Sequence, residues 1–325
     1  MNHVRLHKAH IKDTCWSLLQ KGERKKMVNE MNRGIWFGLS GYVLWGLSPI
    51  FWKALTEIDA LDVLSWRILC TFVFTLFAIK LFRKGKELRD VVFSRSGLLA
   101  GMTCGLLIGF NWGMFVWAVD SNHVVDASLG YFMNPLMNVL LGVVILREKL
   151  RSAVWLSVSL AFIGVLWLTI ALGSFPWISV SLACSFALYG LIRKVAPAGP
   201  LTGLTIETST VAIPALIFLL MRGNAADNMS ISTSVTVLVL LSGLATGIPL
   251  LLFASSARRI PLSILGLLQY ITPTLQLLLG IFAYGEDFDG KRFIGYSIIW
   301  FGLLLFAVDG FTAARRREHK GIETN

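Results

Sequence analysis

Long runs of apolar residues, separated by short polar segments, occupy most of this chain of 325 residues. A helix needs roughly 20 apolar residues to cross the hydrocarbon core of a bilayer, and these runs reach that length. The pattern therefore predicts an all-α membrane protein with ten transmembrane helices. Their expected ranges are about 34–54, 63–82, 97–118, 127–146, 153–172, 175–192, 201–221, 234–256, 262–284 and 293–312.

The segments between these helices are too short to hold a water-soluble domain. Composition agrees, because 55% of the residues are hydrophobic and 15% are charged, whereas soluble domains carry about 25% charged residues. Outside the helices we expect a polar cytoplasmic segment at 1–33 and a basic cytoplasmic tail at 314–325. Met27 and Met31 stand just before the first helix, so residues 1–30 are expected to be a dispensable tail or a start-site extension.

The distribution of basic residues predicts how the chain is oriented. The net charge is +11, and 25 of the 30 lysines and arginines fall in segments on one side of the membrane if successive helices alternate in direction. Cytoplasmic loops are enriched in these residues, so both termini are predicted to be cytoplasmic. Orientation and contact with anionic lipid explain the positive charge, and no nucleic-acid partner is expected.

An internal repeat becomes visible when the chain is shifted by 138 residues, which places Pro135 on Pro273. This shift spans five helices, an odd number, so the second half is predicted to cross the membrane in the opposite direction. The chain is therefore expected to consist of two inverted five-helix repeats, 34–172 and 173–313. Such repeats are common in secondary transporters, whose substrate sites lie near the midplane between the halves. In the same register Gly105, Gly109 and Gly142 fall on Gly243, Gly247 and Gly280, and Glu148 falls on Glu286.

The helices at 127–146 and 262–284 carry matching stripes of small and polar residues, each with a proline near the middle. A proline leaves a backbone carbonyl without its helical partner, and in lipid that group must be satisfied by protein or by cavity water. Both faces are therefore expected to point inward, with Pro135 and Pro273 as hinges. A static polar seam between the halves is the alternative. The residues predicted to line the substrate cavity on these helices are Tyr131, Asn134, Gln269 and Tyr270.

The helix at 97–118 has a glycine at every fourth position, which allows another helix to pack closely against it. We expect this packing role rather than a cavity wall. Asn111 and Trp112 stand beside the glycines and are predicted to line the cavity. An amide in hydrocarbon needs a partner, so the alternative for Asn111 is a hydrogen bond between two helices. The glycines are Gly101, Gly105, Gly109 and Gly113.

Two ionisable residues, Arg67 and Glu207, are predicted to lie well inside membrane helices. A charge at the centre of the bilayer costs about 2.5–3.5 kcal/mol or more, so each is a candidate functional residue. Arg67 is expected either to contact the substrate or to extend to the outer surface. Glu207 is predicted to be a coupling carboxylate that carries a proton. Their predicted depths differ by more than about 10 Å, which argues against a direct ion pair between them.

Six segments carry a family resemblance: GYVLWGLSPIFWKAL at 41–55, LSWRIL at 64–69, SLGYFMNPL at 128–136, LIRKVAP at 191–197, LTIETS at 204–209 and GLLQYITPT at 266–274. Through them the chain resembles the EamA-type transporters of the drug/metabolite transporter superfamily, and most closely the RarD branch. The resemblance extends over about residues 32–313. It implies ten helices in two inverted halves, a bacterial inner-membrane location and export of small molecules.

Motifs of other protein classes are absent from the sequence. The chain has no GxxxxGK[ST], HExxH or GxSxG pattern, and its four cysteines lack CxxC spacing, so no enzyme activity, cofactor or metal is expected. The predicted function is secondary transport of a small molecule, a metabolite or drug-like compound, by alternating access. The alternatives are a membrane-embedded enzyme or a non-transporting scaffold. A ten-helix chain can work alone, so we expect a monomer or homodimer in the lipid bilayer.

Overall fold

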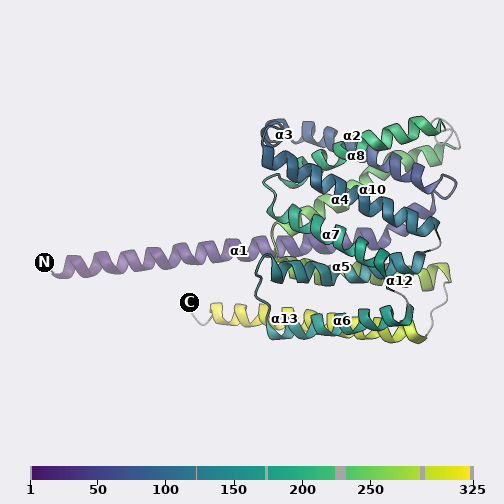
Figure 1. Ribbon diagram of the computed structural model, residues 1–325. Coiled ribbons are helices and arrows are strands. Elements are labelled where there is room, and N and C mark those ends of the chain that lie inside the picture. Colours follow the sequence, from purple (N-terminus) through teal and green to yellow (C-terminus); the bar gives the residue numbers. More distant parts are fainter. Residues whose placement is uncertain (1, 122, 173–174, 224–231, 286–289, 323–325) are drawn as a thin grey trace.

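The computed structural model describes residues 2–121, 123–172, 175–223, 232–285 and 290–322 (Figure 1). All regular secondary structure in these ranges is helical, as the apolar runs predict. The helices are α1 (Asn2–Lys53), α2 (Ala60–Leu81), α3 (Gly85–Val92), α4 (Arg95–Asp120), α5 (Val124–Val144), α6 (Ser152–Leu172), α7 (Trp177–Val195), α8 (Pro200–Arg222), α10 (Thr233–Ala257), α11 (Leu262–Gln269), α12 (Ile271–Tyr284) and α13 (Gly290–Ile322).

Within the described ranges, ten helical segments are long and apolar enough to cross a membrane, which confirms the predicted number of spans. One of them, Leu262–Tyr284, is made by α11 and α12 together, and α3 is a short helix between two spans. The first span, Lys26–Lys53, is the second part of the long helix α1. The polar stretch expected at 1–33 therefore continues into the first span as one helix.

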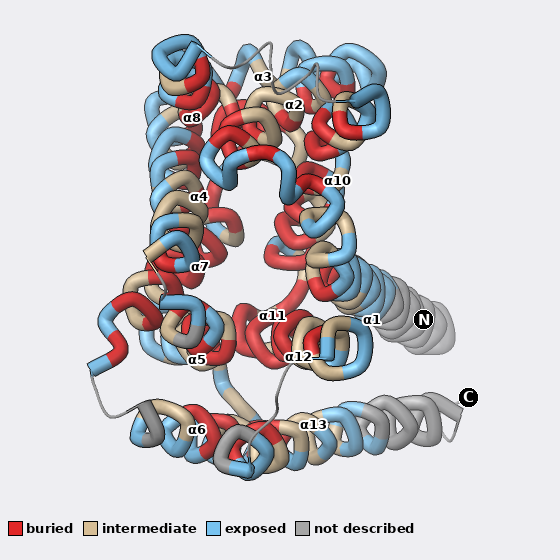
Figure 2. Tube along the Cα trace, turned by 90° about the vertical axis from the view of Figure 1, so that its right-hand side faces the viewer, coloured by how far each residue is buried: buried red, intermediate tan, exposed pale blue. Residues whose placement is uncertain are grey.

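Viewed along the bundle, the spans form a ring with a separate pair of helices beside it (Figure 2). Around the ring, α1 packs against α10, α10 against α2, α2 against α8, α8 against α4, α4 against α7, α7 against α5 and α5 against α11, while α12 returns to α1. The pair α6 and α13 lies outside, next to α5. Most neighbours in the ring are far apart in sequence, so distant parts of the chain converge on its inner side.

The two ends of the bundle differ in charge. The start of α1 and the end of α13 project from the same end (Figure 1), which we call the basic end because its loops contain residues such as Arg83, Lys149 and Arg259. The other end, which we call the acidic end, contains Asp59 and Asp120. Both termini thus lie at the basic end, and the predicted cytoplasmic location of that end stays a prediction.

The two prolines predicted to act as hinges occupy different helix positions. Pro135 lies inside α5, which continues through it as one helix. The span expected at 262–284 is present, but it is divided at Tyr270, where α11 and α12 meet. Pro273 therefore lies in the first turn of α12, where a backbone N–H has no helical acceptor and proline is tolerated. The span is thus broken three residues before the second proline, and the hinge role of both prolines stays a prediction.

Three of the four regularly spaced glycines of α4, Gly101, Gly105 and Gly109, pack against another helix, α8, as their spacing predicts. A Cβ atom added to Gly105 would lie 2.6 Å from the carbonyl oxygen of Glu207, so this close approach of two backbones requires glycine. Gly113, two turns further on, has no such neighbour within 4 Å. In the matching helix of the second half, Gly243 of α10 packs equally closely against the backbone of Cys70 on α2. The repeat partner expected for Glu148, Glu286, lies outside the described residues.

Candidate functional site

Arg67 lies about two turns into α2 from the acidic end. Its guanidinium carbon is 4.3 Å from the ring centre of Trp112 on α4 and 5.3 Å from that of Trp52 on α1. The two indoles belong to helices that are not neighbours in the ring, so the guanidinium lies on the ring's inner side. Each contact of this kind contributes about 0.5–2 kcal/mol.

No acidic side chain forms an ion pair with Arg67 in the described part of the chain. Its Nε atom is buried there without a hydrogen-bond partner. Tyr131 of α5, on the opposite side of the ring from α2, lies within electrostatic range of the guanidinium. The Tyr131 ring in turn packs edge-on against Phe115 of α4, with centroids 5.5 Å apart. The structure thus brings together three residues predicted to line a cavity: Arg67, Trp112 and Tyr131.

Asn111 occupies a different place, in the contact between α4 and α7. Its side-chain amide is 8% exposed and donates hydrogen bonds to the carbonyl of Leu182 and the hydroxyl of Ser185, both at 2.9 Å. Both acceptors belong to α7. The geometry is therefore that of the alternative foreseen for Asn111, a hydrogen bond that joins two helices.

One hydrogen bond joins polar side chains of α5 and α11, and other polar groups of this region are unsatisfied. Asn138 of α5 donates to Gln269 of α11 at 2.8 Å, which links the two helices. The side-chain oxygen of Asn134 and the hydroxyl of Tyr270 are buried without a hydrogen-bond partner among the described residues. Buried polar groups are normally paired, so these two are available to a ligand or to water. Asn138 was not among the predicted site residues, although it lies one turn after Asn134.

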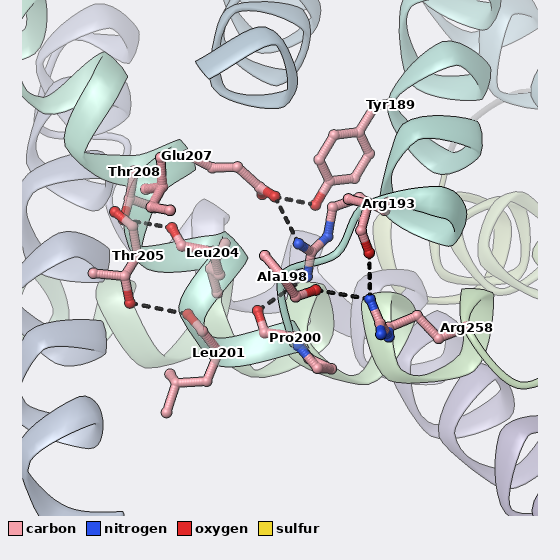
Figure 3. Close-up of polar contacts among 12 residues, drawn as sticks. Tyr189, Arg193, Ala198, Pro200, Leu201, Leu204, Thr205, Glu207, Thr208 and Arg258 are labelled. Carbon is pink, nitrogen blue, oxygen red and sulfur yellow. Dashed lines mark hydrogen bonds and ion pairs between the residues drawn. The ribbon is translucent and has the colours of Figure 1, made fainter. Parts of the chain in front are cut away.

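Glu207 of α8 is at the centre of a buried polar cluster near the basic end (Figure 3). Its Oε1 lies 3.1 Å from Nη1 of Arg193 on α7, and each side chain is 1% exposed. The hydroxyl of Tyr189, one turn before Arg193, donates to Oε2 at 3.1 Å. Arg193 also donates from Nη2 to the carbonyl of Pro200 at 2.9 Å. The carboxylate is therefore paired and hydrogen-bonded, and Arg67 is not its partner, as the difference in depth predicted.

The partner of Glu207 is the main residue that sequence reasoning missed. The helix predicted at 175–192 left Arg193 in a cytoplasmic loop, which was wrong, because α7 extends to Val195 and Arg193 is buried. A signal existed, since an acidic residue inside a span is almost always paired with another polar group. Arg193 and Lys194 are the two basic residues at the end of the preceding helix, and the segment that connects this helix to α8 is short enough to bring one of them to Glu207.

The basic end is closed by side chains that bond to the ends of neighbouring helices. Glu148, in the segment after α5, accepts from the N–H groups of Leu262 at 2.6 Å and Ser263 at 2.9 Å and so caps α11. Lys194 of α7 donates to the carbonyl of Ile260 in the segment before α11. A carboxylate at a helix N-terminus and an ammonium on free carbonyls both favour this closed arrangement.

Arg258 makes a third connection at the basic end, visible in Figure 3. Its Nη1 donates to the carbonyls of Ala196 at 2.7 Å and Ala198 at 2.8 Å, which joins the end of α10 to the segment between α7 and α8. Burial, and after it the charges of Arg193 and Arg259, lower the pKa of Arg258 from its usual value. In the sequence this arginine had counted only as an orientation signal.

Aromatic side chains fill the inner side of the ring between the basic end and Arg67. Trp45 lies two turns before Trp52 on α1, about 10 Å nearer the basic end at 1.5 Å per residue. Its ring lies 5.9 Å from that of Phe186 on α7 and 5.8 Å from that of Phe253 on α10. The helices α1 and α7 are not adjacent around the ring, so the contact of Trp45 with Phe186 crosses it. Tyr42 and Tyr189 complete the group.

A model of the EamA-like transporter family matches residues 32–170 and 176–308, which is most of the chain. The chain belongs to the EamA-like transporter family. This finding and the ten apolar helices make it a multi-pass membrane protein. Among the described residues of this EamA-family chain, no group of three or more His, Cys, Asp or Glu side chains could hold a metal ion.

Relatives within the family resemble this chain over nearly its whole length. An "Uncharacterized transporter" of Vibrio cholerae serotype O1 is 39% identical over 87% of this chain and 95% of its own length. "Protein RarD" of Escherichia coli strain K12 is 35% identical over 88% of this chain and 98% of its own. A protein of known crystal structure shares the fold with a TM-score of 0.66 at 19% identity, covering 88% of this chain and 98% of that one. These two relatives are named as a transporter and a RarD protein.

Proposed function

We propose that this EamA-family chain is a secondary transporter that exports a small molecule, a metabolite or drug-like compound, by alternating access. One observation carries the proposal. Towards the acidic end the ring holds a cation, Arg67, among aromatic rings and without an acidic partner in the described part of the chain. Towards the basic end, aromatic side chains fill the inner side of the same ring, and hydrogen bonds connect the ends of its helices. This is the arrangement expected of a transporter closed at one end.

Two inverted five-helix halves are supported by which helices pack together. If each span is replaced by the span five positions later in the chain, the contact of α1 with α10 corresponds to that of α7 with α4. In the same way, the contact of α10 with α2 corresponds to that of α4 with α8. The same shift relates Gly105, packed on α8, to Gly243, packed on α2. Two halves with equivalent contacts can rock against each other about a common site, with Pro135 and Pro273 as hinges.

The proposed orientation places the basic end in the cytoplasm, because lysine and arginine are enriched in cytoplasmic loops. Arg67 would then face the periplasmic side of the inner membrane in a bacterial cell, and the relatives compared above are bacterial. The substrate path would run past Arg67, Trp112 and Tyr131 to the buried polar groups of Asn134 and Tyr270. The proposed working unit is a monomer or a homodimer.

Coupling to a proton is proposed at Glu207. Its negative charge holds the guanidinium of Arg193 and so ties α8 to α7. A proton on Glu207 would remove that charge and weaken the connection, because the ion pair would become a hydrogen bond between a charged guanidinium and a neutral carboxyl group. Proton uptake would thereby be linked to the relative movement of helices at the closed end.

Transport can be tested with the full chain purified and reconstituted into proteoliposomes. A panel of metabolites and antibiotics is first screened by thermal shift, and compounds that stabilise the protein are then assayed for flux with and without a proton gradient. We expect at least one compound to move faster than through protein-free liposomes, with a rate that depends on the gradient. If compounds bind but none crosses faster than in the protein-free control, secondary transport is refuted.

A further inference from the structure

We infer that Arg67 and the aromatic side chains around it bind the carboxylate of an organic anion with a flat apolar body. We call Arg67, Trp52, Trp112 and Tyr131 the Arg67 cluster. The inference rests on the proposed transport function and names the class of substrate for that site. Its starting point is the guanidinium between two indoles, on the inner side of the ring.

The charge of Arg67 is not balanced by the protein within the described residues. A cation at depth in a membrane costs about 2.5–3.5 kcal/mol or more, and a cation–π contact returns about 0.5–2 kcal/mol. The buried Nε makes no hydrogen bond there, and no ion pair joins the guanidinium to an acidic side chain. Arg193, an arginine buried in another span, has its charge neutralised by Glu207 at 3.1 Å. Arg67 therefore lacks the counter-charge that its counterpart has.

Two acidic residues at the start of α2 are already engaged in ion pairs. Asp62, on the same helix as Arg67, lies 3.2 Å from Nη1 of Arg222 on α8. Asp59 lies 2.9 Å from the same atom, and this hydrogen bond lowers the pKa of Asp59, which keeps it charged. Rearrangement of either carboxylate onto Arg67 would break one of the two ion pairs of Arg222. An external anion can supply the missing charge without breaking an existing pair.

The side chains around the guanidinium indicate the kind of anion. A guanidinium presents N–H donors in a planar fork that matches the two oxygens of a carboxylate. Trp52 and Trp112 flank the charge with flat apolar surfaces, and Phe115 and Tyr131 extend that surface. Tyr131 adds a hydroxyl that can donate to an oxyanion. A carboxylate attached to an aromatic or other flat apolar group uses all of these features.

The binding test compares benzoate with benzamide, which has nearly the same shape but no charge. Both are titrated against the purified full-length protein in a neutral detergent, with thermal shift and isothermal titration calorimetry as readouts. We expect benzoate to stabilise the protein and to bind on the order of tenfold or more tightly than benzamide, because a charge-assisted hydrogen-bonded pair is lost in the amide. Equal binding of the two, or no binding of benzoate, overturns the inference.

Three variants assign the effect to the cluster. Arg67→Gln is expected to weaken benzoate binding on the order of tenfold or more while leaving benzamide unchanged. Arg67→Lys keeps the positive charge but not the planar fork of N–H donors. Its affinity for benzoate should therefore lie between those of the natural protein and Arg67→Gln. Lys53→Gln removes one positive charge from the same end outside the cluster, where Lys53 lies over the ring of Tyr284, and should bind benzoate as the natural protein does. Loss of benzoate binding in Lys53→Gln, or its retention in Arg67→Gln, contradicts the inference.

The carboxylate could belong to a soluble acid or to a lipid, and the membrane composition separates these sources. Benzoate binding is repeated in nanodiscs of phosphatidylcholine with and without phosphatidylserine. Unchanged affinity supports a soluble acid, whereas Arg67-dependent competition by phosphatidylserine supports a lipid carboxylate at the same site. Binding needs no flux, so the two proposals can fail separately. Benzoate binding without transport of any compound refutes transport alone, and transport without benzoate binding refutes the carboxylate site alone.

Discussion

Arg193 of α7 and Glu207 of α8 form an ion pair of 3.1 Å, and each side chain is only 1% exposed. Two charges removed from water stabilise a fold only while each neutralises the other. The hydroxyl of Tyr189 donates to the second carboxylate oxygen, and Arg193 donates to the carbonyl of Pro200, whereas the Nε of Arg193 makes no hydrogen bond among the described residues. The pair therefore holds the basic end of the ring together and places an ionisable group where a proton would loosen it.

Replacement of one member of this ion pair should lower the free energy of unfolding more than replacement of both members. Arg193→Met leaves the charge of Glu207 buried and unpaired, and we expect a loss of about 3–5 kcal/mol in the free energy of unfolding. The double variant Arg193→Met with Glu207→Gln leaves no unpaired charge and should recover most of that loss. Denaturant titration of the purified proteins measures both. A double variant as unstable as the single one would show that the ion pair is not the source of the effect.

Glu207→Gln should abolish the response of transport to a proton gradient, because the glutamine amide cannot take up or release a proton. The variant also leaves Arg193 without its counter-charge, so flux is compared for equal amounts of folded protein in proteoliposomes. Gradient-independent exchange of the substrate is the internal control and should persist. Normal stimulation by the gradient in Glu207→Gln would refute the coupling role.

Gly105→Ala should destabilise the contact of α4 with α8. The new Cβ would lie 2.6 Å from the carbonyl oxygen of Glu207, which belongs to the backbone and cannot move aside cheaply. We expect a cost of about 1–3 kcal/mol, seen as a lower thermal midpoint. Gly113→Ala, on the same helix, meets no neighbouring atom within 4 Å and should be neutral or slightly stabilising. Similar midpoints for both variants would contradict close packing at Gly105.

Glu148→Ala should loosen the closed basic end by removing the cap of α11. The carboxylate accepts from two backbone N–H groups and from the Ser263 hydroxyl, and hydrogen bonds to a charged group contribute about 1.5–3 kcal/mol. Hydrogen exchange at the first residues of α11 should accelerate. Glu148→Gln retains one acceptor oxygen and should show a smaller change. Unaltered exchange in Glu148→Ala would mean that the cap does not hold this helix end.

Replacement of the hinge prolines should affect turnover more than binding. Pro135→Ala and Pro273→Ala restore a backbone N–H and remove the ring, which should favour straighter and more continuous helices. We expect a lower maximal flux with little change in substrate affinity. Pro214→Ala is the matched control, because this proline is inside α8 but exposed on its outer side. Weaker binding at unchanged turnover would assign the two prolines to the substrate site instead.

Much of the fold follows from local properties of the sequence. Apolar runs of sufficient length predict the ten spans. A glycine at every fourth position of α4 predicts that this helix packs closely against another helix. These features depend on the hydrophobic effect and on helical periodicity, which act over a few turns of chain. For the same reason the sequence could mark Arg67 and Glu207 as unusual, since a charge in an apolar run is conspicuous without any knowledge of its neighbours.

The partners of those residues were decided by the tertiary structure. Arg193 was assigned to a loop because a helix end cannot be located to within a turn from hydropathy, and one further turn carries it into the bundle beside Glu207. Trp52 and Trp112 meet Arg67 because helices far apart in the chain meet around a ring. Asn111 donates a hydrogen bond to α7 because the same packing places α4 beside α7. Hydropathy reports depth in the membrane, whereas pairing depends on the rotation and order of the helices, which only their mutual packing sets.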